Sequence, residues 1–457
     1  MKYFYKPIYF TLISLTFFLN FSFRNSIIYA EQIVDINLEK EIKKGNFLIG
    51  LKQYLGKDIN KDFLNFKTDD EFLRVVSENG LNHQSKQVKI VFKKIPIEKP
   101  YVLEKLVSKP FASFESAKQQ SELLTKQGLK PIITMPNSWE IWLPIENKDK
   151  VNQNFRIKRT TINSEIIPYL INKYTFQKLE GPISVMSEDD ITINDINYGK
   201  NFYLVKDSYG TWTLIQKLSF LKYLKGVLPH EIGANSPLEA LKAQAVIART
   251  WAIYNAKRFE ADKFHLCVTT QCQVYKPDIV NKNIEKAIID TRNMVLVFEG
   301  KPINAFYHAS NGGISASSSE SWKMRDYPYL ISEFDFINFE KNYSYPSISG
   351  REELRYFLKS DKNNFFGNSH YLFRWKRKVS NNQILNLLQK NNLLSENSEI
   401  LDLKVTQRGA SGRVIKLEIS QNNSGSKVTL VKDDIRRSLS FLPSNLFIID
   451  KLNDNLW

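Results

Sequence analysis

The chain has 457 residues, of which 42% are hydrophobic and 13% aromatic, and its formal net charge is +16. This length exceeds that of a single hydrophobic core, and the composition excludes a disordered chain, so roughly two or three globular domains are expected. Two cysteines are too few for disulfide bonds to be the main source of stability.

The first 30 residues have the pattern of an export signal. Lys2 and Lys6 precede an apolar run from Ile8 to Phe23, and the small residue Ala30 follows. This order predicts a signal peptide that is cleaved after Ala30. An uncleaved membrane anchor is the alternative, because the run is short for a bilayer span but rich in phenylalanine. Both interpretations place the rest of the chain outside the cytoplasm, in the periplasm or the cell wall.

The positive charge favours anionic surroundings. Cell-wall polymers and acidic lipid headgroups both qualify as partners, whereas an exported location disfavours nucleic acid. Lysine and arginine are spread along the chain without a concentrated basic arm, so charge alone does not choose between these partners.

Residues 101–150 have the pattern of a β-α-β-β unit. A strand is expected up to Lys109–Pro110, and an amphipathic helix is expected over 113–128. Two further strands are expected over 131–135 and 139–143.

Several positions of this unit resemble a SPOR repeat. They are Phe111–Phe114 at the start, Ala117 and Leu124 in the helix, and Gly128 at its end. The resemblance implies binding to glycan strands stripped of peptides. A plain α/β subdomain without this role is the alternative.

A short helix is expected ahead of residue 230. Leu224 and Leu228 share one face at helical spacing. Pro229 disfavours continuation of the helix through the residue before it, so the helix should stop there. His230 and Glu231 are then expected in a turn.

A second helix is expected to begin a few residues later. Ser236 is predicted as its N-cap, Pro237 as its first residue and Glu239 as the acid of a capping box. Its apolar stripe, which includes Leu241 and Ala245, is rich in alanine and would let another element pack closely.

Glu231 is therefore expected in a rigid corner between two helices, flanked by Leu228 and Ile232. Apolar surroundings raise the pKa of a carboxyl group, which suits a general acid. A solvated turn glutamate without a chemical role is the alternative.

Two neighbouring blocks carry the most specific pattern in the chain. They are Gly226–Ile232 and Pro237–Thr250. Together they resemble the signature of the SpoIID and LytB family, whose proposed catalytic glutamate corresponds to Glu231. Further similar blocks follow at Cys267–Tyr275, Ala287–Phe298, Pro302–Gly313, Pro328–Leu330, Arg408–Val414 and Leu442–Phe447. The resemblance extends over residues 181–450.

This resemblance implies lytic cleavage of peptidoglycan glycan strands. The bond between N-acetylmuramic acid and N-acetylglucosamine is broken, and a 1,6-anhydro sugar remains. Glu231 would protonate the leaving oxygen and then take the proton of the muramic acid's own 6-hydroxyl. Ordinary glycosidases need two carboxylates, and no obvious second acid stands beside Glu231 in the sequence.

The resemblance also implies residues that line a sugar-binding cleft. Gly312 and Gly313 would let the backbone approach a ligand, while His308 and Ser310 would bind sugar hydroxyls. A glycine turn after a strand, without a ligand, is the alternative. Gln244, Arg249 and Tyr275 are further candidates, although an arginine on a helix more often forms an ion pair.

A metal site is considered because some family members carry zinc in the second motif. The local donors here are His265, Cys267 and Cys272, with His308 as a distant fourth, while Gln271 is a poor zinc ligand. An exported location favours a disulfide between the cysteines over zinc, and two unpaired thiols are the third alternative. The lytic reaction itself requires no cofactor.

Two rival functions remain open. A non-catalytic wall-binding protein that stimulates a cell-wall amidase is one, because related proteins are described as amidase enhancers. A hydrolytic muramidase is the other, and it requires a second carboxylate. The expected partners are glycan strands, including strands already freed of stem peptides, and an amidase.

The predicted fold is a multidomain α+β protein with a mixed helical catalytic core and β-rich flanking subdomains. The regions are a signal peptide (1–30), an N-terminal α/β region (31–100), the SPOR-like unit (101–150), a β-rich subdomain (151–218), and a SpoIID-like catalytic core with a C-terminal β region (219–457).

Overall fold

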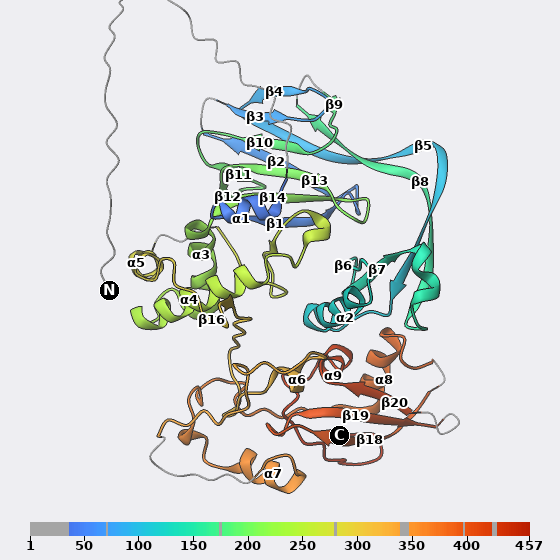
Figure 1. Cartoon of the computed structure of the whole chain (residues 1–457), viewed down its shortest axis with the longest axis vertical. Helices are drawn as coiled ribbons and strands as arrows, with labels where there is room; N and C mark the ends of the chain where they lie inside the picture. Colours follow the sequence, from blue (N-terminus) through green and yellow to red (C-terminus); the bar gives the residue numbers. More distant parts are fainter. Residues whose placement is uncertain are drawn as a thin grey trace, which may run out of the picture. The chain divides into compact units, whose positions relative to one another are not determined.

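The computed structural model describes residues 36–69, 72–172, 176–277, 281–338, 347–395, 398–422 and 427–457. The predicted export signal lies outside these residues. The predicted α+β class is confirmed, since several sheets and helices alternate along the described chain (Figure 1). None of the described helices has both the length and the apolar character needed to cross a membrane.

Two sheets form the first core of the protein, and their strands are antiparallel except for the parallel pair β1–β15. One has the strand order β15-β1-β14-β13-β10-β3-β4, and in the other the order is β12-β11-β2-β5-β7-β6, with β8 on β5 and β9 on β8. Their apolar side chains meet in one cluster, in which the rings of Phe66 and Phe202 lie 6.3 Å apart. The strands of the first sheet are β1 (Asn46–Leu55), β3 (Leu73–Val76), β4 (Asn82–Ser85), β10 (Ile183–Met186), β13 (Phe202–Lys206), β14 (Trp212–Ser219) and β15 (Leu266–Cys267). Those of the second are β2 (Phe63–Thr68), β5 (Gln87–Ser108), β6 (Ile132–Thr134), β7 (Glu140–Pro144), β8 (Phe155–Ile171), β9 (Phe176–Lys178), β11 (Ile191–Ile193) and β12 (Ile196–Gly199).

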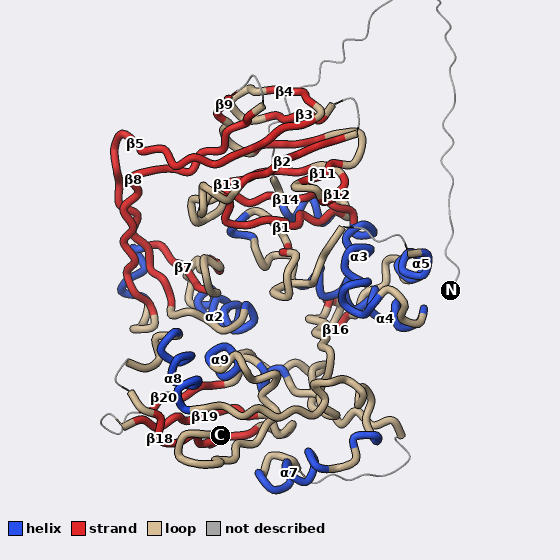
Figure 2. The backbone as a smooth tube through the Cα atoms, turned by 180° about the vertical axis from the view of Figure 1, so that it is seen from behind, coloured by secondary structure: helices blue, strands red, loops and turns tan. Residues whose placement is uncertain are grey.

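The β-α-β-β pattern is present as predicted from the sequence. It consists of the end of β5, helix α2 (Phe114–Lys126), β6 and β7, followed by the 3-10 helix η1 (Ile145–Lys150). Ser113 caps α2 by accepting a hydrogen bond from the Ser116 amide. The unit is continuous with the second sheet, because β5 and β8 run together along most of their length (Figure 2).

Two lysines face each other on this long pair of strands. Lys105 and Lys158 are direct partners in the β5–β8 register, and the Lys105 ammonium lies 3.0 Å from the centre of the Trp142 ring. Partial burial and the charge of Lys158 lower the pKa of Lys105 to about 8. Like charges directly opposite each other destabilise a sheet.

This pair predicts a measurable dependence of stability on pH. Between pH 8 and the ordinary lysine pKa of about 10.4, Lys105 binds more protons in the unfolded chain than in the folded protein. The contribution of Lys105 to the free energy of unfolding therefore rises with pH in this range. Lys158→Gln should reduce this rise, as measured by urea midpoints at pH 7.5 and 10. Lys99→Gln, which changes an exposed lysine of β5, is the control. Equal pH responses of wild type and Lys158→Gln would contradict the prediction.

A helical layer packs on β1 and β14. It contains α1 (Leu38–Lys43), α3 (Phe220–Leu228), α4 (Leu238–Tyr254) and α5 (Lys282–Asp290), while the 3-10 helix η3 (Glu260–Asp262) contacts β6. Apolar residues of α3 and α4 share a cluster with Phe47 of β1 and Leu218 of β14. Ala245, Ala248 and Ala252 of α4 are fully buried, and their small side chains let neighbouring elements pack closely on this helix.

The C-terminal region has a core of its own. It lies in the predicted C-terminal β region, where β18 and β19 pair with β20 in an antiparallel sheet. Its elements are β18 (Ile400–Arg408), β19 (Val414–Gln421), β20 (Lys427–Val431), α8 (Asn381–Lys390) and α9 (Asp433–Ser438). The chain before them contains the hairpin β16 (Val297–Phe298) and β17 (Lys301–Pro302), α6 (Ser318–Ser321), α7 (Arg351–Lys359) and the 3-10 helix η4 (Lys362–Asn364).

Candidate active site around Glu231

Helix α3 leads to Glu231, and one wider helical turn follows directly after its last residue. Helix α3 stops at Leu228, as predicted, but Pro229–Gly233 form a π-helical turn instead of leaving the helix. Leu228 and Pro229 both keep right-handed helical backbone angles. Proline has no N–H to donate within the helix, and π-helical turns of this kind are common at functional sites. Glu231 therefore lies in the middle of this π-helical turn.

The predicted N-cap of the next helix is wrong. Helix α4 begins at Leu238, Pro237 occupies the cap position, and no side chain caps this end. The Ser236 hydroxyl instead donates a hydrogen bond of 2.7 Å to the Ile232 carbonyl. This bond ties the start of α4 back to the π-helical turn, so Ser236 supports the segment that carries Glu231.

The Glu231 carboxylate has two hydrogen-bonding partners. The Val274 amide donates to Glu231 Oε1 at 2.6 Å, and the Tyr307 hydroxyl forms a side-chain hydrogen bond with the same carboxylate. Burial, and after it the negative charge of Glu231, raise the pKa of Tyr307 far above its usual range. Tyr307 therefore stays a neutral donor. The environment of Glu231 is more polar than the apolar flanks Leu228 and Ile232 suggested.

Two buried side chains hold Tyr307 in place. The side-chain Nε2 of Gln273 donates to the Tyr307 hydroxyl at 3.1 Å, and the Tyr223 hydroxyl donates to the side-chain Oε1 of Gln273 at 3.0 Å. Gln273 is 1% exposed and Tyr223 is fully buried. A continuous chain of hydrogen bonds thus runs from Tyr223 in α3 to Glu231. The sequence did not single out Tyr223, Gln273 or Tyr307, although Gln273 and Tyr307 lie in the blocks that resemble family motifs.

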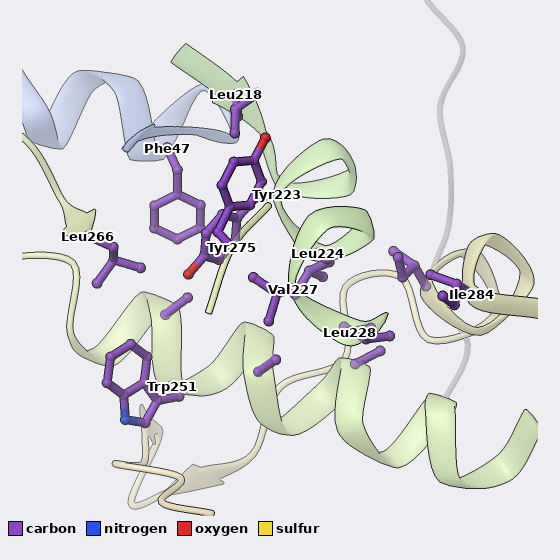
Figure 3. Close-up of a cluster of buried hydrophobic side chains, with 14 of the residues drawn as sticks. Phe47, Leu218, Tyr223, Leu224, Val227, Leu228, Trp251, Leu266, Tyr275 and Ile284 are labelled. Atoms are coloured by element: carbon purple, nitrogen blue, oxygen red, sulfur yellow. The ribbon is translucent and has the colours of Figure 1, made fainter. Parts of the chain in front are cut away.

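The segment with Val274 crosses closely over α3. The Lys276 amide donates to the Gly226 carbonyl at 3.2 Å, and a Cβ on Gly226 would lie 2.3 Å from the Tyr275 ring. The Tyr275 ring stacks on Tyr223, with centroids 5.9 Å apart (Figure 3). Gly226 is therefore needed for the approach that brings Val274 to Glu231.

Gly226→Ala should lower the free energy of unfolding by about 1 to 3 kcal/mol, the usual cost of overpacking. The added methyl group would also meet the Lys276 carbonyl at 2.4 Å, which cannot rotate away as a side chain can. Urea unfolding measures the loss, and Lys222→Ala on the exposed face of α3 is the control. An unchanged unfolding midpoint in Gly226→Ala would show that this crossing is not tightly packed.

His230 lies beside the catalytic candidate. Its Nε2 atom is buried and has no hydrogen-bond partner among the described residues. Burial, with a smaller effect from the charge of Lys276, lowers the pKa of His230. A neutral histidine is therefore expected next to Glu231 near pH 7.

The residues considered for zinc are engaged elsewhere. Cys267 and Cys272 form a disulfide, and both ring nitrogens of His265 hydrogen-bond to the backbone, at Leu48 and Leu38. Gln271 accepts a hydrogen bond from the Trp139 indole. Among the described residues no group of three metal-ligating side chains comes together. This donor set does not fit a tetrahedral zinc site.

Three of the predicted sugar-binding residues are buried in the helical layer. The Arg249 guanidinium donates to the carbonyls of Thr291 and Met294, each at 2.9 Å, and so supports the chain after α5. Tyr275 belongs to the hydrophobic cluster. Gln244 is 8% exposed, and its Nε2 has no partner within the described chain. Within the described chain, neither Gln244 nor Arg249 is hydrogen-bonded to Glu231.

The loop around Gly312 packs on the C-terminal region. Both glycines have positive φ, and a Cβ on Gly313 would lie 2.9 Å from the Phe365 ring. The Gly312 carbonyl accepts a hydrogen bond of 2.7 Å from Arg374. His308 is exposed and Ser310 is partly buried. The glycines thus have a packing role, while sugar binding by His308 and Ser310 stays a prediction.

Two family models match different parts of the chain. A Stage II sporulation protein (SpoIID) model matches residues 208–298, and a Domain of unknown function (DUF8618) matches residues 316–457. The SpoIID match is shorter than the range of 181–450 over which similar motifs were identified. It includes Glu231, Gln273 and Val274 but ends before Tyr307.

Three proteins are similar over parts of their length. The chain is 43% identical to Amidase enhancer of Bacillus subtilis over 112 residues, which is 24% of this chain and 15% of that protein. It is 36% identical to an uncharacterized protein of Brachyspira hyodysenteriae over 147 residues, 32% of this chain and 39% of that protein. Stage II sporulation protein D of Bacillus subtilis is 29% identical over 134 residues, 26% of this chain and 39% of that protein. The chain thus spans less than half the length of each relative, and the SpoIID match over residues 208–298 supports the resemblance to the SpoIID/LytB family that its motifs indicate.

Proposed function

We propose that this protein cleaves peptidoglycan glycan strands by a lytic transglycosylase reaction, with Glu231 as general acid and then general base. The family relationship supports a role at peptidoglycan. The lytic mechanism is supported above all by the fixed position of the Glu231 carboxylate, which the Val274 amide and the Tyr307 hydroxyl hold from two separate loop segments.

The proposed reaction has two linked proton transfers. Protonated Glu231 gives its proton to the glycosidic oxygen as the bond from C1 of N-acetylmuramic acid to that oxygen breaks. The 6-hydroxyl of the same sugar attacks C1, and its proton passes to the Glu231 carboxylate. The 1,6-anhydro ring forms and Glu231 returns to its protonated state, so no water, metal or second carboxylate takes part.

The surrounding residues would serve to keep this carboxyl group in one place. A proton-transfer group must stay within hydrogen-bond reach of its target, and a rigid network reduces the cost of orienting it. Val274, Tyr307 and Gln273 have that positioning role in the proposal. The substrate is the glycan strand, including strands freed of stem peptides, and the location is the periplasm or the cell wall.

The proposal is tested by the length of glycan strands after incubation with the protein. Peptide-stripped strands should become shorter with wild type and remain long with Glu231→Gln, as measured by size-exclusion chromatography. Unchanged strand length with well-folded wild type would contradict cleavage.

Stimulation of an amidase is the second candidate function. The similarity to a protein named Amidase enhancer, at 43% identity over 112 residues, favours it. In this case the release of stem peptides by a purified cell-wall amidase should rise when the protein is added, and Glu231→Gln should stimulate as well as wild type. The two readouts separate the functions, because one follows the glycan chain and the other the peptides.

A further inference from the structure

The C-terminal region contains a basic pocket that is separate from the Glu231 site. Its volume is about 170 Å³, and it is lined by Arg351, Leu403, Lys404, Val405, Arg408 and Ile449. Arg351 begins α7, the next four residues come from β18, and Ile449 follows α9 in the chain. All six lie within the part of the chain that matches the domain of unknown function.

The two arginines of this pocket are held by backbone carbonyls. Arg408 Nη1 donates to the carbonyls of Gly412 at 2.9 Å and Phe447 at 2.8 Å. Arg351 Nη2 donates to the Ile449 carbonyl at 2.8 Å. Because part of each guanidinium is fixed by a nearby stretch of backbone, the orientation of both groups is set before any ligand binds.

The positive charge of the pocket is incompletely balanced. Asp450 contacts Arg351 at 2.6 Å and Arg355 at 2.8 Å, and Glu352 lies 3.9 Å from Arg351 and 3.7 Å from Arg355, so these two acids are shared by the two arginines of α7. Neither Arg408 nor Lys404 forms an ion pair with another described residue. Glu418 faces Lys404 across the β18–β19 register, yet its carboxylate pairs with Lys427.

Burial and repulsion both act on Arg408. Burial, and then the charge of Arg351, lower its pKa to about 10. Holding like charges together in a partly dry pocket is unfavourable unless an anion joins them. The apolar lining by Leu403, Val405 and Ile449 suits the carbon part of an ester beside the charged group.

We propose that this pocket binds a phosphoryl group, presented as a phosphate ester of a cell-envelope molecule or as free phosphate. Guanidinium groups donate paired hydrogen bonds that match phosphate oxygens, and the lysine adds a third positive charge. The pocket would then attach the C-terminal region to an anionic partner while Glu231 acts elsewhere. The inference does not depend on the proposed reaction at Glu231.

Binding by the whole protein tests the proposal. Inorganic phosphate and glycerol phosphate are titrated calorimetrically at constant ionic strength in chloride, and sedimentation is measured with vesicles of phosphatidylglycerol or phosphatidylcholine. Binding of the soluble phosphates supports a free or polymer-borne phosphate. Sedimentation with phosphatidylglycerol vesicles alone supports a lipid headgroup.

Variants identify the pocket as the site. Lys404→Gln and Arg351→Gln should each weaken binding about tenfold, the usual effect of losing one charge-assisted hydrogen bond. Lys390→Gln, an exposed lysine of α8 outside the pocket, should change binding less than twofold. Urea midpoints identify any variant that fails to fold, and thermal stabilisation of wild type by phosphate over chloride gives a second readout. Absence of binding to every probe, or equal binding by wild type, Lys404→Gln and Arg351→Gln, would overturn the proposal.

Discussion

Replacing Glu231 with glutamine is expected to lower the rate of glycan cleavage by about a thousandfold, within the usual range for removal of a general acid or base. The amide cannot deliver a proton to the leaving oxygen or take one from the 6-hydroxyl. Its oxygen can still accept the Val274 hydrogen bond, so the fold should be kept. The rate of release of soluble fragments from peptide-stripped strands measures the effect.

Two further variants make this result specific. Glu239→Gln changes an exposed glutamate at the start of α4 and should leave the rate unchanged. Tyr307→Phe removes a hydrogen bond to the carboxylate but not the acid itself, so a smaller loss of about tenfold is expected. Retention of the full wild-type rate by Glu231→Gln would exclude the proposed role of this residue.

The second large effect is expected at a buried ion pair outside the Glu231 site. Glu115 of α2 accepts hydrogen bonds from Arg258 at 2.7 and 3.2 Å, and the two side chains are only 8% and 5% exposed. The guanidinium also lies over the rings of Phe114 and Trp251. Glu115→Ala should lower the free energy of unfolding by about 3 to 5 kcal/mol, because a buried charge would lose its partner.

Urea unfolding of three variants checks this account of the ion pair. Glu122→Ala, an exposed glutamate of the same helix, controls for the loss of a carboxylate from α2. The double variant Glu115→Leu with Arg258→Leu should be more stable than Glu115→Ala, since it leaves no unpaired charge. If Glu115→Ala lowers the free energy of unfolding no more than Glu122→Ala does, the expected cost of an unpaired buried charge is contradicted.

Local sequence signals predicted much of the secondary structure. Apolar periodicity located α2 and the strands β6 and β7. Such signals act within one element, so they can be read without knowing the tertiary fold. The same applies to the end of α3 at Leu228, where proline follows.

Short-range rules failed where tertiary contacts outweighed them. Pro229 did not release the chain into an open turn, because the following residues continue as a π-helical turn. Ser236, which has the side chain of an N-cap, donates to Ile232 instead of capping α4. Both departures occur beside Glu231, where the backbone is shaped by the segment that crosses over α3.

The candidate site could be predicted only in part. Glu231 was identified from its motif, but its partners Val274 and Tyr307 come from segments 43 and 76 positions away in the sequence. Tyr223 has the spacing of a core residue, and its hydroxyl bond to Gln273 depends on the fold. The requirement for glycine at position 226 could not be predicted either, since it comes from the ring of Tyr275, which is distant in the sequence.

The chemical nature of the product ends tests the proposed reaction most directly. Residues 31–457, as wild type and as Glu231→Gln, are incubated with peptide-stripped glycan strands, and the soluble products are analysed by mass spectrometry. The account predicts fragments ending in 1,6-anhydro-muramic acid from wild type and none from the variant. Reducing ends in their place would contradict the lytic step, and an absence of fragments while wild type still sediments with the strands would contradict cleavage and support a binding role.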